Sequence, residues 1–230
     1  MKNLKYILSF ALIGILLPWA VNGRVFRLGG AADGRLNTAG LPWVHAYSTV
    51  MDVNGQRNSV RVYSAGRHEP AAEQLRAQFE SQGAQVDLQP AADGGAMGVA
   101  RWEGGEARFL VLAPDSVPGQ TVFLFYPEPG KKSGPVFPVP EYPRGVVENS
   151  VFNVDTDTFC ATLKTLDAPG QVQRYYAGVL AASGWKPLLP LKASGGMALF
   201  HKKERTCCVL ANRRENGETS VTLLVRSGAL

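Results

Sequence analysis

Few side chains of this chain have the chemistry for catalysis, and only one histidine is followed directly by a carboxylate. His68 is followed by Glu69 just before a predicted helix, and a histidine beside a carboxylate can act as a general acid and base in a hydrolase. Glu69 is explained more simply as a negative charge that stabilises the N-terminus of that helix. His45 and His201 have no such neighbour. We therefore assign no catalytic residue and keep a secreted hydrolase using His68 and Glu69 as an alternative.

Three cysteines, Cys160, Cys207 and Cys208, lie in the second half of the chain. Successive side chains of a strand point to opposite faces, so only one of the adjacent pair can face inward. For an oxidising compartment we predict a disulfide between Cys160 and either Cys207 or Cys208, with three buried, unreactive thiols as the alternative. Their spacing is not that of a metal site. We predict no metal and no cofactor.

The motifs of common enzymes do not occur in this sequence. It contains no Gly-x-Ser-x-Gly, no P-loop and no Gly-x-Gly-x-x-Gly. This result leaves enzymatic activity open but favours a non-catalytic function. Four aromatic residues remain as candidates for a binding surface, with packing in the core as the alternative: Trp43, Tyr47, Trp102 and Tyr175.

The elements that would position these residues recur at a shift of about one hundred positions. An amphipathic helix is predicted over 70–83, and Val172, Tyr176 and Leu180 repeat its apolar spacing before Gly184. In both halves one strand precedes the helix, and a Gly-Gly turn and three strand-like stretches follow it. This order predicts an α+β fold after the N-terminal hydrophobic segment. Its two tandem β-α-β-β-β units would have mostly antiparallel sheets, each covered by a helix.

Two local signals add elements to this scheme. Residues 43–53 and 58–63 predict a hairpin, because Asn54-Gly55 between them is a preferred type I′ turn. Asp155 and Asp157 are predicted to cap a short helix over 159–166.

The domain boundaries follow from a proline-rich stretch in the middle of the chain. Six prolines between 127 and 143 resist both helix and sheet, so we predict a stiff linker over 127–144. The first unit, including the hairpin, is then 24–126, and the second unit is 145–230.

The N-terminus resembles an export signal in its charge and hydropathy. Lys2 and Lys5 precede an uncharged apolar run over 6–21, and small residues at 21–23 could permit cleavage. We predict that 1–23 is a signal peptide or an N-terminal anchor. The protein would then be periplasmic, or anchored to the membrane through 6–21 and facing the periplasm.

The charge of the chain argues against nucleic acid as a partner. The formal net charge is +5 for the whole chain and +3 without the two lysines of the leader, which is too small a basic excess to attract a polyanion. The basic clusters are Lys131-Lys132, Lys202-Lys203 with Arg205, and Arg213-Arg214, and we interpret them as solvated loop ends.

These observations favour a non-catalytic exported envelope protein that binds another envelope protein, as an accessory or assembly factor of a secretion or surface apparatus. The predicted export signal, the predicted duplication and the absence of a catalytic motif support this hypothesis. Besides the hydrolase, the remaining alternative is a module that binds a small ligand or a polysaccharide through Trp43, Tyr47 and Trp102.

Overall fold

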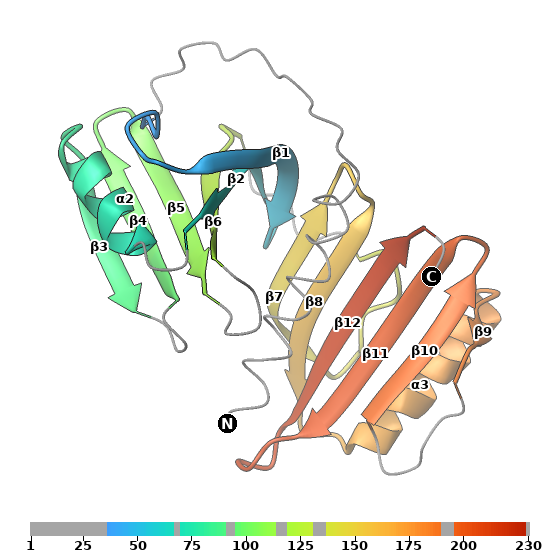
Figure 1. The fold of residues 1–230 in the computed structure, drawn as a ribbon. Coiled ribbons are helices and arrows are strands. Elements are labelled where there is room, and N and C mark those ends of the chain that lie inside the picture. The colour runs from blue at the N-terminus through green and yellow to red at the C-terminus, as the bar shows by residue number, and fades with distance from the viewer. Residues whose placement is uncertain are drawn as a thin grey trace. The chain divides into compact units, whose positions relative to one another are not determined.

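The computed structural model describes residues 36–66, 70–90, 95–113, 119–130, 137–189 and 196–228. The chain divides into two compact units, and Figure 1 colours the chain from blue at its N-terminus to red at its C-terminus. Unit 1 comprises Met1–Val50 and Asn58–Gly130, and unit 2 comprises Met51–Arg57 and Lys131–Leu230.

Along the chain, a hairpin followed by one helix and four strands occurs twice (Figure 1). The first set consists of β1 (Val44–Val53), β2 (Gln56–Ala65), α2 (Ala71–Glu80), β3 (Gln85–Pro90), β4 (Ala96–Trp102), β5 (Gly105–Leu112) and β6 (Gln120–Pro127). The second set consists of β7 (Val146–Asn153), β8 (Thr158–Thr165), α3 (Pro169–Ala182), β9 (Lys186–Pro187), β10 (Gly196–Lys202), β11 (Arg205–Arg213) and β12 (Thr219–Ser227).

The predicted fold class is wrong. Within the described residues, twelve strands form one antiparallel sheet in the order β3-β4-β5-β6-β2-β1-β7-β8-β12-β11-β10-β9, with only two helices. This is not a tandem β-α-β-β-β arrangement, because two strands precede each helix and four follow it. The order from β3 to β1 is the same as the order from β9 to β7. An internal duplication stays a hypothesis, which this equal order supports.

One missed strand explains much of the error. Instead of the short helix predicted over 159–166, residues 159–165 belong to β8, whose turn with β7 contains Asp157 at φ 46°. Side chains on both faces of β8 are buried, so the sequence shows a continuous apolar and threonine-rich run instead of an alternating one. Such a run cannot be told from a buried helix by its periodicity.

The predicted hairpin and the two main helices are confirmed. β1 and β2 are joined by Asn54 and Gly55, both at positive φ (52° and 77°). Each helix ends with a glycine in the left-handed region, Gly83 or Gly184. The next residue donates its N–H to the carbonyl five positions earlier, which closes a Schellman motif in both units.

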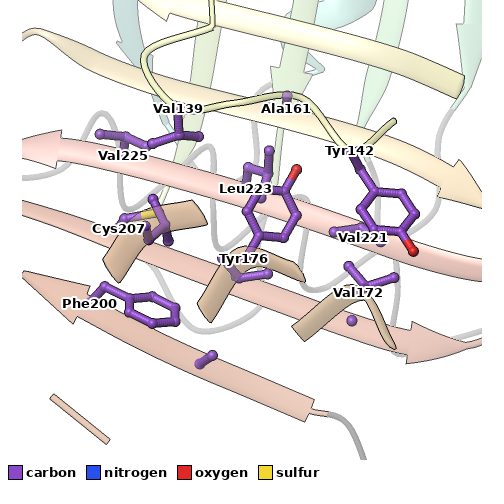
Figure 2. Packing of buried hydrophobic residues seen from close by; sticks show 14 of the residues in the cluster. Val139, Tyr142, Ala161, Val172, Tyr176, Phe200, Cys207, Val221, Leu223 and Val225 are labelled. Carbon is purple, nitrogen blue, oxygen red and sulfur yellow. The ribbon is translucent and has the colours of Figure 1, made fainter. Parts of the chain in front are cut away.

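Each helix buries its apolar face against the strands of its own unit. In unit 1, Ala71, Leu75 and Phe79 of α2 are fully buried. In unit 2, Val172, Tyr176 and Leu180 of α3 take these places, and Figure 2 shows Val172 and Tyr176 packed against residues of β11 and β12. Neither helix of the described part is long and apolar enough to cross a membrane.

The described end of the proline-rich segment packs on unit 2. Val139 and Tyr142 belong to its core (Figure 2). Tyr142 also donates a hydrogen bond to Asp167 at 2.5 Å, and Asp167 in turn pairs with Arg144 at 2.9 Å. The stiff linker over 127–144 stays a prediction for the rest of the segment.

Candidate functional site

The three aromatic residues predicted for ligand binding in the first unit are half-buried. Trp43 and Trp102 pack against the core of unit 1, and the Trp43 indole N–H donates to Gln74 at 3.1 Å. The hydroxyl of Tyr47 is buried without a hydrogen-bond partner, and burial raises its pKa above the usual range. These contacts give the three side chains a part in the packing of unit 1, and ligand binding by them stays a prediction.

The fourth aromatic candidate, Tyr175, lies in a group of tyrosines in unit 2. Its ring is 5.1 Å from that of Tyr142 and 5.2 Å from that of Tyr176 between centroids. Its hydroxyl donates to the carbonyl of Glu141 at 2.7 Å. These contacts attach the segment around Tyr142 to α3, so Tyr175 has a structural role that accounts for its position.

The structure does not test the hydrolase residues, because His68 and Glu69 lie outside the described residues. His45 contacts Ser48 Oγ at 2.9 Å, and burial and then the charge of Arg61 lower its pKa. In the described part of the chain, no group of three or more His, Cys, Asp or Glu side chains is arranged to hold a metal ion.

The predicted disulfide is not formed, and all three cysteines are free. Cys207 faces the core of unit 2, whereas Cys208 lies on the opposite face of the sheet. Cys160 on β8 and Cys208 on β11 both pair with Leu224 of β12, so one strand separates them. Two strand spacings amount to about 9.5 Å, beyond the roughly 7 Å that a disulfide spans.

The feature of unit 2 with most capacity for binding is the outer edge of its sheet. β9 pairs with only Phe200 and His201 of β10, and Leu188 adds one hydrogen bond to the carbonyl of Leu199 at 2.8 Å. The rest of β10 has no neighbouring strand on that side among the described residues. Three large apolar side chains are exposed at this edge: Leu188 (41%), Leu189 (40%) and Met197 (50%).

A basic pocket lies at the turn where β10 leads into β11. Its volume is about 410 Å³, and it is lined by Pro138, Trp185, Lys202, Lys203, Glu204, Arg205 and Ser227. The ammonium of Lys202 donates to the carbonyl of Ser183 at 2.7 Å, and Arg205 pairs with Asp157 at 3.1 Å. Neither this pocket nor the open edge was predicted from sequence, although the cluster of Lys202, Lys203 and Arg205 was visible there.

Comparisons with known proteins add little. No protein-family model matches the chain, and no curated protein matches it. One solved structure, described as "Crystal structure of MucB in complex with MucA(peri)", is 11% identical over 80% of this chain and 92% of that chain, with a TM-score of 0.17. A TM-score of this size does not establish a shared fold.

Proposed function

We propose that this chain is an exported, non-catalytic protein that binds another envelope protein through the outer edge of unit 2. The observation that carries the proposal is the stretch Gly196–Ala198 of β10, which has no partner strand on its outer side among the described residues, with Leu188, Leu189 and Met197 exposed beside it. Exposed apolar side chains that gather in one place are typical of interaction surfaces. An unpaired strand edge also offers backbone N–H and C=O groups to an incoming chain.

The edge suits a partner that adds an extended segment to the sheet. In such strand addition, main-chain hydrogen bonds supply affinity and apolar contacts supply specificity. At the opposite end of the strand order, β4 is paired with β3 from Ala96 to Arg101, that is, at every residue except Trp102. The two ends therefore differ in how much of the neighbouring strand is covered.

Export and the biological role are proposed from the sequence. The Lys2 and Lys5 start and the apolar run over 6–21 support export. A role as an accessory or assembly factor of a secretion or surface apparatus fits a protein that combines export with an interaction surface. No described observation favours the hydrolase or the polysaccharide-binding module over this role.

Site-specific crosslinking tests the proposal with a control in the same chain. Met97 and Met197 are exposed to the same extent (49% and 50%), and each lies opposite a leucine of the next strand, Leu110 or Leu210. A photo-crosslinking amino acid at position 197 in cells of the source organism should give one product of defined mass. The same amino acid at position 97 should give none.

Two outcomes would contradict the proposal: no specific product at position 197, or the same products at both positions. The second result would indicate general stickiness of exposed methionines instead of a partner at the open edge. Loss of the product in a Leu188→Glu variant that keeps its circular dichroism spectrum would place the contact at the edge.

A further inference from the structure

We infer that the partner presents an acidic segment, and that its carboxylates bind in the basic pocket at the β10–β11 turn. This inference rests on the proposed function and adds the chemistry of the partner. The pocket lies at the C-terminal end of β10, whereas the uncovered part of the strand is at its N-terminal end, Gly196–Ala198. The covering strand β9 lies between the two, so a partner that reaches both must pass β9. About four residues of extended chain span the distance from Ala198 to Lys202, because a strand advances about 3.4 Å per residue.

The cations of the pocket differ in how far they are already satisfied. Arg205 pairs with Asp157, and its Nε is buried without an acceptor. Lys202 donates only to a neutral carbonyl, that of Ser183. Lys203 has no hydrogen bond or ion pair within the described residues. Two ammonium groups at the pocket therefore lack an anionic partner in the described part of the chain, and incoming carboxylates can supply one.

The backbone of Lys203 is a second, independent observation. Lys203 lies in a two-residue hairpin turn with φ at 52°, in the left-handed region that favours glycine. A lysine at such a position is strained, and strained residues cluster at functional sites. A glycine would form the turn more easily, so the conformation of the turn does not explain the lysine.

The corresponding turn of unit 1 has the opposite charge. There Trp102 pairs with Gly105, and Glu103 and Gly104 form the turn. In unit 2, Lys202 pairs with Arg205, and Lys203 and Glu204 form the turn. A two-residue turn at the equivalent place therefore exists in this chain without a basic cluster and without a positive φ at Glu103, and it serves as the control.

The charge of the surrounding chain favours an anionic partner over a cationic one. Residues 131–230 contain 13 lysines and arginines and 8 aspartates and glutamates, a formal net charge of +5, whereas residues 24–130 contain 9 and 11, a net charge of −2. Lys186, paired with His201, adds a cation between the open edge and the pocket. Trp185 and Pro138 give the pocket apolar surface for the methylene groups of glutamate, which inorganic phosphate would not use.

A binding titration with the full chain and fluorescein-labelled hexaglutamate tests the inference. Anisotropy should show saturable binding that weakens with added salt. Lys203→Gly should weaken binding roughly two- to fivefold, the range of one exposed charge contact, and Lys203→Gly with Lys202→Gln roughly tenfold. Glu103→Gln in the matched turn should leave the affinity within roughly twofold. The Tm of Lys203→Gly should stay unchanged or rise, because glycine relieves the turn.

Several results would overturn the inference. One is that hexaglutamate does not bind, and another is that the Lys203→Gly and double variants bind it as tightly as the wild type does. A third is that equimolar inorganic phosphate displaces the peptide. The last is a Tm of Lys203→Gly clearly below that of the wild type. The last would show that Lys203 serves stability. A partner crosslinked at position 197 together with failed peptide binding would refute the acidic segment alone and leave the proposed function standing.

Discussion

The two units have the same order of strands but place their large core side chains on different elements. In unit 1, Gly98 of β4 lies opposite Phe109 of β5, and Ala100 lies opposite Ala107. In unit 2, Ala198 of β10 lies opposite Val209, and Phe200 lies opposite Cys207. Of these two neighbouring strands, the one that carries the fully buried aromatic residue is β5 in unit 1 and β10 in unit 2.

The two helices also carry their buried aromatic residues at different positions. Phe79 of α2 packs edge-on against Phe109, with 6.4 Å between the ring centroids, whereas the corresponding residue of α3 is Leu180 and the ring of that helix is Tyr176, one turn earlier. After the helix, the residue closing the Schellman motif is Ala84 in unit 1 and the buried Trp185 in unit 2. Cores constrain total volume and pattern more than the identity of each residue, so one strand order accepts both solutions.

The largest expected effect concerns Phe200, the buried aromatic residue of β10, because unit 1 has no aromatic side chain at this position. Phe200 is fully buried in unit 2, and Ala100 takes the corresponding place in unit 1. Phe200→Ala should lower the free energy of unfolding by about 3–5 kcal/mol, the usual cost of emptying an aromatic site in a core. Urea titration followed by circular dichroism measures it.

Phe200→Leu is the control, with an expected loss below about 1.5 kcal/mol because it keeps most of the volume. If Phe200→Ala cost less than about 1 kcal/mol, the ring would not support the core as its burial indicates.

A smaller effect is expected at Gly98 of β4, where unit 2 has an alanine. A Cβ added at Gly98 would overlap the ring of Phe109 and lie 2.6 Å from the carbonyl oxygen of Asp87. Gly98→Ala should therefore destabilise the protein by about 1–3 kcal/mol through overpacking.

Combining Gly98→Ala with Phe109→Val reproduces the Ala198 and Val209 pair of unit 2 and should cost less than the sum of the single changes. Urea titration of the four proteins of this double-mutant cycle measures the coupling. Strict additivity would show that the clash lies with the backbone of Asp87 and not with the ring.

Local signals in the sequence predict local structure well in this chain. Asn54-Gly55, Gly83 and Gly184 each require positive φ, and the structure places them in a turn and at two helix ends. The strand β8 was mistaken for a helix because both of its faces are buried. The number of strands before the second helix could not be obtained without that element.

Features that depend on pairing between distant segments could not be predicted. The pairing of Met51–Val53 with Val151–Asn153, which joins β1 to β7, has no local signal. The shortness of β9 likewise appears only when its partner strand is known. The basic pocket combines Pro138, Trp185 and Ser227 with the β10–β11 turn, so the sequence supplied its lysines but not their surroundings.

The smallest expected effect is a pH dependence of stability that comes from the cysteines. All three cysteines of the chain belong to unit 2. Burial, with a smaller contribution from Cys208, raises the pKa of Cys160 to about 11 and that of Cys207 to about 12. In the unfolded chain a thiol ionises near pH 8.5. Because the folded state holds these protons and the unfolded state loses them, stability should fall as the pH rises above about 8.5 and keep falling towards the folded pKa values.

Between pH 8 and pH 9, each of these two thiols should lower the free energy of unfolding by roughly 0.7 kcal/mol. Buried tyrosines do not contribute in this window, because an unfolded tyrosine ionises only near pH 10. Urea titrations at the two pH values measure the loss, and a Cys207→Ala variant should lose its share of the pH dependence. An unchanged dependence in that variant would mean that the Cys207 thiol ionises as readily in the folded core as in the unfolded chain. The packing of Cys207 of β11 in the core of unit 2 would then not exclude water as its burial indicates.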